Sequence, residues 1–178
     1  KFFFLILFAF GFIKLYAQTE PAKTTEKESL VNWISLSEAE KHNKEVPKPI
    51  IIDFYTSWCG WCKVMMNTTY SDPAIASYIN ANFYPVKFDA ETKDTIEYDG
   101  VKYKPTGTEK RDPNEFAVKM LNGTMMYPST IFMNKAANFT MSAQGYLETK
   151  KIEPMLVFTL ENGLRNSSYE NFNKKFKK

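Results

Sequence analysis

Two cysteines, spaced as Cys-x-x-Cys, are the residues of this chain best suited to do chemistry. Cys59 and Cys62 are the only cysteines in the sequence, and they follow the short apolar run Ile50-Ile51-Ile52-Asp53-Phe54-Tyr55. This run is rich in β-branched residues and too short for a typical helix, which predicts a central strand buried on both faces. Good helix formers follow from Lys63 onward. The pair is therefore expected where a buried strand turns into a helix.

The start of a helix is a place where a thiol becomes reactive. A helix N-terminus has unsatisfied N–H groups and about half a positive charge, which stabilise a thiolate. We expect Cys59 at the helix end, within reach of a partner, and Cys62 one turn deeper on the same face. The expected cycle is attack by Cys59 on a partner's disulfide, formation of a mixed disulfide, and resolution by Cys62.

A zinc site and a purely structural disulfide are the two alternatives for the pair. Structural zinc sites usually have four ligands, and the sequence offers no third cysteine and a single histidine, His42. A disulfide across so short a loop removes little entropy from the unfolded chain and would stabilise the fold poorly. The strand that precedes the pair therefore favours redox chemistry, and we expect neither a metal nor a cofactor.

A longer stretch around the cysteines carries a family resemblance. It consists of Asp53-Phe54-Tyr55 and Trp58-Cys59-Gly60-Trp61-Cys62-Lys63, and it resembles the active site of the thioredoxin superfamily. It looks most like that of the secreted bacterial thioredoxin-like proteins, and the resemblance runs from about Trp33 to Gly163 with one insertion. It implies an α/β thioredoxin-like fold, with a mixed central sheet flanked by helices, an inserted β-hairpin and a C-terminal extension. Thioredoxin has a proline where this chain has Trp61, so the resemblance does not fix the redox potential.

The resemblance also implies catalytic roles for an acid and a lysine. Asp53, inside the apolar strand, matches the buried acid that assists deprotonation of the second cysteine in thioredoxins. Burial should raise its pKa and make it a competent base near neutrality. Lys87 matches the family's lysine near that acid, although a surface lysine is the alternative. The expected catalytic residues are thus Cys59, Cys62, Asp53 and Lys87.

A third set of residues matches the substrate-binding positions of the family. Pro128 resembles the cis-proline that faces the cysteines and exposes the backbone of Tyr127 to a substrate peptide, a trans proline being the alternative. Gly145 matches the glycine that lets a partner backbone approach. Aromatic side chains are expected around Cys59, with ordinary core packing as the alternative. The expected substrate-binding residues are Trp58, Gly60, Trp61, Tyr127, Pro128 and Gly145.

The two ends of the chain are expected to lie outside the domain. Residues 1–17 have a basic start and a short apolar core before Gln18, which is typical of a secretory signal peptide; a buried helix is the alternative. Residues 18–29 are polar and predicted to be a disordered spacer. The thioredoxin-like domain is predicted at 30–163, with an insertion at about 92–114, and a basic tail at 164–178. Tyr169, Phe172 and Phe176 give this tail a small apolar stripe.

Local signals predict the elements of the domain. The ranges are a strand at 30–34, a helix opened by a capping box at 37–40, a helix from Pro73 capped by Asp72, a strand at 83–89, a hairpin at 96–103, a helix at 115–121, strands at 125–133 and 139–143, and a helix at 151–161. Pro154 is compatible with the last helix if it lies in the first turn. We expect the insertion to affect partner choice and to be dispensable for folding.

Composition excludes several classes of partner. The chain carries 23 Lys and Arg against 20 Asp and Glu, so no global basic field predicts binding to nucleic acid or a membrane surface. We expect a monomer without a stable membrane span, located in the periplasm or secreted. The expected function is reduction of protein disulfides as a thiol–disulfide oxidoreductase, with an upstream redox partner as electron source. A non-catalytic binding module of the same fold, and a disulfide oxidase or isomerase, are the alternatives.

Overall fold

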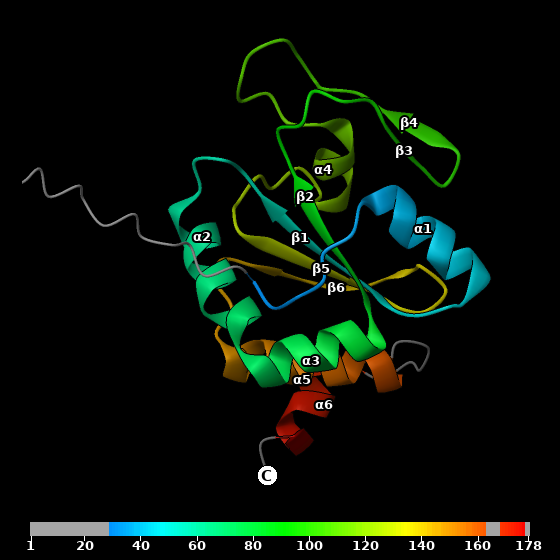
Figure 1. The fold of residues 1–178 in the computed structure, drawn as a ribbon, viewed down its shortest axis with the longest axis vertical. Helices are drawn as coiled ribbons and strands as arrows, with labels where there is room; N and C mark the ends of the chain where they lie inside the picture. Colours follow the sequence, from blue (N-terminus) through cyan, green and yellow to red (C-terminus); the bar gives the residue numbers. More distant parts are fainter. Residues whose placement is uncertain (1–28, 163–167, 177–178) are drawn as a thin grey trace, which may run out of the picture.

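A four-stranded mixed sheet forms the centre of the computed structural model, which describes residues 29–162 and 168–176. Its strands are β1 (Ile50–Tyr55), β2 (Tyr84–Asp89), β5 (Ser129–Met133) and β6 (Phe139–Gln144), in the order β2-β1-β5-β6 (Figure 1). β1 pairs in parallel with β2 and antiparallel with β5, and β5 pairs antiparallel with β6. The predicted mixed sheet with a buried central strand is confirmed. The predicted signal peptide at 1–17 and nearly all of the spacer at 18–29 lie outside the described residues.

Helices cover both faces of this sheet because β1 is apolar on both. Successive side chains of a strand point to opposite faces, so Ile51 belongs to one core cluster, and Ile50, Ile52 and Phe54 belong to the other. The first cluster is closed by α2 (Gly60–Asn67), α3 (Pro73–Asn82) and α5 (Thr149–Asn162), and the second by α1 (Leu36–Glu45) and α4 (Glu115–Met120). A short 3₁₀ turn, η1 (Thr69–Ser71), joins α2 to α3.

The predicted hairpin is present and forms part of the core. Strands β3 (Ile96–Tyr98) and β4 (Val101–Tyr103) pair antiparallel around Asp99 and Gly100, both of which have positive φ. Tyr103 is 6% exposed, and the rings of Tyr98 and Tyr103 each lie with their centroids 5.4 Å from that of Phe116. The hairpin therefore contributes to the packing around Phe116, which counts against the expectation that the insertion is dispensable for folding; that expectation stays a prediction.

The N-terminal part of the domain differs from the prediction in two places. The capping box of α1 is built by Ser35 and Glu38, two residues before the predicted one at 37–40. This choice buries Leu36 and Ala39 on the core side of the helix. The predicted strand at 30–34 is reduced to one bridge between Ile34 and Val86.

The C-terminal part also differs in one respect. α5 begins at Thr149, so Pro154 lies inside the helix and not in its first turn. Proline has no N–H, so the hydrogen bond that position 154 would donate to the carbonyl of Lys150 is missing. Lys150 is an exposed residue. The tail forms α6 (Tyr169–Phe176), which packs on α5 through contacts of Phe158 with Tyr169 and Phe172 (Figure 1). Within the described ranges, no helix combines the length and the apolarity needed to cross a membrane.

Candidate active site

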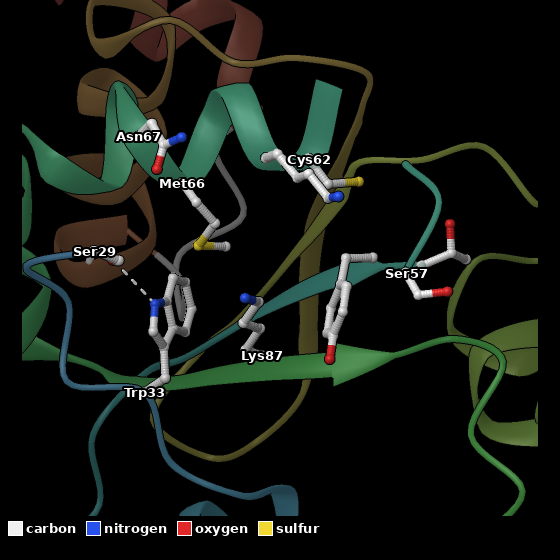
Figure 2. A pocket seen from close by; sticks show the side chains of 10 residues that line it. Ser29, Trp33, Ser57, Cys62, Met66, Asn67 and Lys87 are labelled. Atoms are coloured by element: carbon white, nitrogen blue, oxygen red, sulfur yellow. Dashed lines mark hydrogen bonds between the residues drawn. The ribbon is translucent and has the colours of Figure 1, made fainter. Parts of the chain in front are cut away.

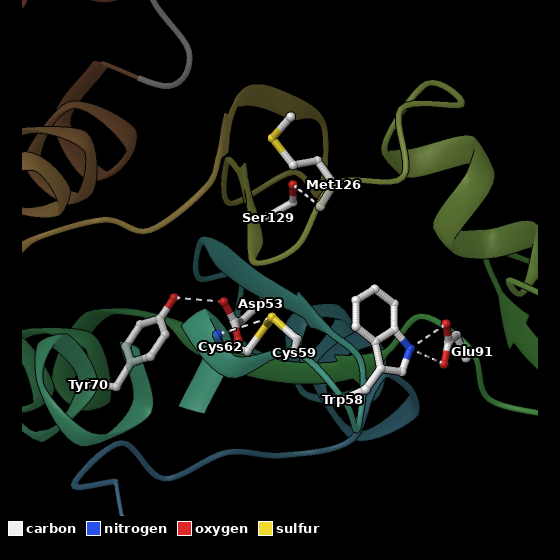
Figure 3. The surroundings of a disulfide bond; sticks show 8 residues. All are labelled: Asp53, Trp58, Cys59, Cys62, Tyr70, Glu91, Met126 and Ser129. Carbon is white, nitrogen blue, oxygen red and sulfur yellow. Dashed lines mark hydrogen bonds between the residues drawn. A yellow bond between two sulfur atoms is a disulfide. The ribbon is translucent and has the colours of Figure 1, made fainter. Parts of the chain in front are cut away.

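The two cysteines form a disulfide at the beginning of α2, as the sequence predicts. Cys59 is the N-cap residue of this helix and Cys62 lies in its first turn, joined to Cys59 by the disulfide (Figure 3). The backbone N–H of Cys62 donates a hydrogen bond to Sγ of Cys59 at 3.1 Å. An N–H group aimed at this sulfur is the contact that stabilises a thiolate at a helix N-terminus. The local structure therefore suits Cys59 for the thiolate form.

Asp53 is fully buried, on the face of β1 that α2 covers. Its Oδ1 accepts a hydrogen bond from the hydroxyl of Tyr70 at 3.3 Å (Figure 3), and its Oδ2 has no partner among the described residues. Burial raises the pKa of Asp53 to about 7, against smaller lowering effects of the Tyr70 hydrogen bond and the charge of Lys87. A carboxyl group with this pKa exchanges its proton near neutrality, which is what a general base requires.

Tyr70 is a residue of the site that sequence reasoning missed. It lies in η1, is fully buried, and meets the ring of Trp33 edge-on at a centroid distance of 4.8 Å. Its backbone carbonyl accepts hydrogen bonds from the hydroxyl of Ser29 and the N–H of Leu30. The segment before α1 therefore holds the tyrosine whose hydroxyl contacts the buried acid.

Lys87 lies beside Asp53 but does not contact it directly. Parallel pairing of β1 with β2 sets Lys87 opposite Asp53, so the two side chains leave the same face of the sheet. Lys87 is exposed, its Nζ lies 4.7 Å from the ring centroid of Tyr55, and no ion pair joins it to an acid of the described ranges. The lysine thus acts on Asp53 through its charge, which lowers the pKa of the acid.

A cavity of about 460 Å³ lies beside Cys62, between α2 and the sheet (Figure 2). Its walls include two lysines, Lys63 and Lys87, and no acidic residue. Thr56, which is 2% exposed, also lines it, and its hydroxyl has no hydrogen-bond partner within the described part of the chain. The buried Cys62 therefore borders a cavity whose walls are partly polar.

The two tryptophans that flank Cys59 and Gly60 in the sequence have exposed rings. Trp58 and Trp61 are 51% and 62% exposed, which excludes core packing for both rings. Trp58 meets Tyr127 edge-on at a centroid distance of 6.1 Å, and Trp61 lies 5.6 Å from Tyr146. We refer to these four rings as the aromatic rim.

Trp58 is held by two residues that the sequence did not single out. Its indole Nε1–H donates to both carboxylate oxygens of Glu91, at 2.9 and 3.0 Å (Figure 3). The guanidinium Cζ of Arg111 lies 5.1 Å from the centroid of the same ring. Glu91 follows β2 and Arg111 belongs to the insertion, so neither is near the cysteines in sequence.

The remaining predicted residues also lie around the disulfide-bearing helix and the adjoining strands. The peptide bond between Tyr127 and Pro128 is cis, immediately before β5. Gly145 has a φ of 83°, and its N–H donates to the carbonyl of Pro128 at 2.8 Å, which joins the two loops. Gly60 is the first residue of α2, and a Cβ there would meet open space. Binding of a substrate by these groups stays a prediction.

A disulfide of Cys-x-x-Cys type at a helix N-terminus, after the buried central strand of a mixed sheet, defines a thiol–disulfide oxidoreductase of the thioredoxin superfamily. The chain belongs to the Thioredox_DsbH family, described as "Protein of unknown function, DUF255", whose model matches residues 13–174.

Two curated relatives are thiol:disulfide interchange proteins DsbD of Vibrio vulnificus. The protein of strain YJ016 is 28% identical over 67 residues, which cover 36% of this chain and 11% of the relative. That of strain CMCP6 is 42% identical over 36 residues, which cover 20% of this chain and 6% of the relative. The chain thus spans only about a tenth of the length of these relatives.

Solved structures of other proteins share the fold. A thioredoxin from Thermus thermophilus has a TM-score of 0.57 at 14% identity, covering 75% of this chain and 90% of its own. A thioredoxin-fold protein from Helicobacter pylori has a TM-score of 0.55 at 13% identity, covering 79% and 93%. A putative disulphide-isomerase from Bacteroides thetaiotaomicron has a TM-score of 0.52 at 19% identity, covering 80% and 99%. The predicted thioredoxin-like fold is confirmed.

Proposed function

We propose that the protein is an exported thiol–disulfide oxidoreductase that reduces disulfides in other proteins. The observation that carries this proposal is the pairing of Cys59 with Cys62 at the start of α2, with the buried Asp53 on the sheet face that this helix covers. A binding module or a structural disulfide gains nothing from a buried carboxyl group that costs stability. A reductase needs such a group when its second thiol has to lose a proton.

The reaction proceeds in two exchanges. The Cys59 thiolate attacks one sulfur of the partner's disulfide, so that a mixed disulfide forms and the other partner sulfur leaves as a thiolate. Cys62 then gives its proton to Asp53 and attacks Sγ of Cys59, which releases the second partner sulfur as a thiolate. The partner gains two electrons, and the oxidoreductase is left with the Cys59–Cys62 disulfide. An upstream dithiol partner returns two electrons to it.

Lys87 has a supporting role in this proposal. Its charge favours the ionised form of Asp53, so the acid is ready to accept the proton of Cys62 when the mixed disulfide has formed. The proton then leaves through the cavity beside Cys62, whose walls include Lys87. The lysine is thus expected to adjust the pH range of the second exchange without touching the sulfurs.

Substrate binding is assigned to the aromatic rim and to the backbone beside it. The exposed rings of Trp58 and Trp61 offer an apolar surface, and Tyr127 offers backbone groups for strand-like pairing with a peptide. The rest of the proposed set is Gly60, Pro128 and Gly145, whose backbone groups we expect a partner chain to approach. Protein disulfides are the proposed substrates, and the protein is proposed to act as a monomer.

Export is proposed from the sequence pattern of residues 1–17, which is that of a secretory signal peptide. The layout that follows is a spacer at 18–29, a thioredoxin-like domain at 30–163 and a tail at 164–178. The names of the two curated relatives, thiol:disulfide interchange proteins, support a redox protein as the upstream partner. The proposed substrates are then disulfides of proteins that are periplasmic or secreted, because these proteins share the compartment of an exported oxidoreductase.

Reduction of insulin distinguishes a reductase from a binding module. In the presence of dithiothreitol, catalytic amounts of the wild-type protein should accelerate the precipitation of reduced insulin, and Cys59→Ser should leave only the uncatalysed rate. Binding of insulin is measured in parallel by fluorescence anisotropy. A wild-type protein that binds insulin but reduces it no faster than Cys59→Ser would establish the binding module instead.

A further inference from the structure

The insertion reaches the active site through Arg111. Its guanidinium lies over the ring of Trp58, the residue directly before Cys59, with Cζ 5.1 Å from the ring centroid. Half of Trp58 remains exposed, and Glu91 fixes the Nε1 edge of the ring. A polypeptide that lies on Trp58 to present its disulfide to Cys59 therefore comes close to Arg111.

The loop that carries Arg111 is fixed by its own hydrogen bonds. The Nζ of Lys93 donates to the carbonyls of Glu109 and Asp112 at 2.6 and 3.0 Å, and the N–H of Glu109 donates to Oδ2 of Asp112 at 2.7 Å. At the ends of the loop, the N–H and the hydroxyl of Thr106 both donate to the carbonyl of Pro113. Arg111 is thus presented by a closed turn, which reduces the entropy lost when it contacts a partner.

The guanidinium of Arg111 is available to a partner. Arg111 is exposed and makes no hydrogen bond or ion pair with any residue of 29–162 or 168–176. The nearby carboxylate, that of Glu91, already accepts the indole N–H with both oxygens. A guanidinium presents its N–H groups as a planar fork, and a carboxylate is the group that fits this fork best.

We propose that Arg111 is a specificity-determining residue that binds a carboxylate beside the disulfide of the partner protein. This inference rests on the proposed function, because it names the class of disulfide that the same site prefers. The preferred substrates are protein disulfides flanked by Asp or Glu on the side that contacts Trp58. Trp58 supplies the surface on which the partner lies, and Arg111 adds the charge that selects among partners.

Two synthetic peptides test this inference. Each contains one intramolecular disulfide, and the two differ only in whether the residues flanking the cysteines are Asp or Asn. The value of kcat/KM for their reduction is measured for the wild type, Arg111→Ala, Arg111→Glu and Lys110→Ala. Lys110 is the matched control because it is the exposed neighbour of Arg111 and has no contact with Trp58.

The wild type and Lys110→Ala should prefer the Asp peptide by about threefold, as expected for one exposed ion pair. The preference should disappear in Arg111→Ala, reverse in Arg111→Glu, and decrease with added salt in the wild type. Equal rates for both peptides in the wild type, or an unchanged preference in Arg111→Ala, would overturn the inference while leaving the proposed function intact. A wild type that reduces neither peptide contradicts the proposed function itself, and the inference with it.

Discussion

Cys62→Ser should lose catalytic turnover and accumulate a mixed disulfide with its protein substrate. The first exchange needs only Cys59, so the partner still becomes attached, but no thiol remains to release it. Turnover of insulin should fall to the uncatalysed rate, as it should in Cys59→Ser. Non-reducing electrophoresis followed by peptide mass mapping should find the partner attached to Cys59.

The matched variant for this experiment is Cys59→Ser. Burial does not distinguish the two cysteines, since Cys59 is 5% exposed and Cys62 is 3% exposed in the disulfide form. Their positions do, because Cys59 caps α2 beside the aromatic rim and Cys62 lies in the first turn beside the cavity. Cys59→Ser should therefore trap no partner. Trapping through Cys62 alone would reverse the assignment of the attacking and resolving thiols.

Asp53→Ala should make the oxidised protein more stable at about pH 8, by roughly 1–3 kcal/mol of unfolding free energy. The folded protein holds the pKa of this acid at about 7, compared with an ordinary value of 3.8. Between these two values the folded state binds more protons than the unfolded state, so the stability of the wild type falls as the pH rises from about 4 to about 7. The advantage of the variant should therefore be absent below about pH 4 and complete above about pH 7.

Denaturant unfolding of the oxidised wild type and variant, at about pH 8 and at about pH 4, measures the difference in unfolding free energy. Asp53→Asn is the companion variant, because it removes the charge and keeps the volume of the side chain. Both variants should also slow the release of the partner from the mixed disulfide near pH 7, and less so at high pH, where Cys62 ionises without help. Variants that are less stable at every pH and equally fast would place Asp53 in a structural role.

Tyr70→Phe provides a second check on the same acid. The hydroxyl of Tyr70 lowers the pKa of Asp53 through its hydrogen bond, so its removal should move the rise of the release rate to higher pH, by about one pH unit. Tyr78→Phe is the control, because the half-buried Tyr78 of α3 makes no hydroxyl hydrogen bond to a described residue. If the pH dependence of the release rate is the same in Tyr70→Phe and the wild type, the role of Tyr70 is limited to packing in the core.

The core of the site could be predicted because its signals are local. The apolar run of β1, the Cys-x-x-Cys spacing and the helix formers after it lie within one short stretch, and the cap of α3 by Asp72 before Pro73 is equally local. Asp53 could be predicted as a functional residue because a carboxyl group buried in an apolar strand costs stability. Natural sequences keep such costly residues mainly at functional sites. Each of these features follows from the order of residues along the chain.

The contacts that complete the site could not be predicted because they join distant segments. The hydrogen bond between Tyr70 and Asp53 joins η1 to β1. The contact between Arg111 and Trp58 joins the insertion to the residue before Cys59. The sequence predicted the hairpin turn at Asp99. It could not predict that the hairpin packs on Phe116, because Phe116 belongs to the separate helix α4.

The capping box shows a different limit, because the sequence offers two such boxes that overlap. Ser35 with Glu38, and Ser37 with Glu40, have the same spacing. The first is used because it places Leu36 within the helix and in the core, while Glu40 bonds Lys44 and the N–H of Asp99. Tertiary burial thus decides between two equal local signals.

The reduction potential of the Cys59–Cys62 pair is the measurement that tests a reducing function most directly. It is obtained by equilibrating the protein with dithiothreitol and glutathione buffers and quantifying the dithiol and disulfide forms by alkylation and mass spectrometry. A reductase is predicted to show a reversible two-electron equilibrium at a potential more negative than that of protein disulfide isomerase, about −180 mV. A potential near that of the oxidase DsbA, about −120 mV, or a disulfide that no dithiol buffer opens, would contradict it.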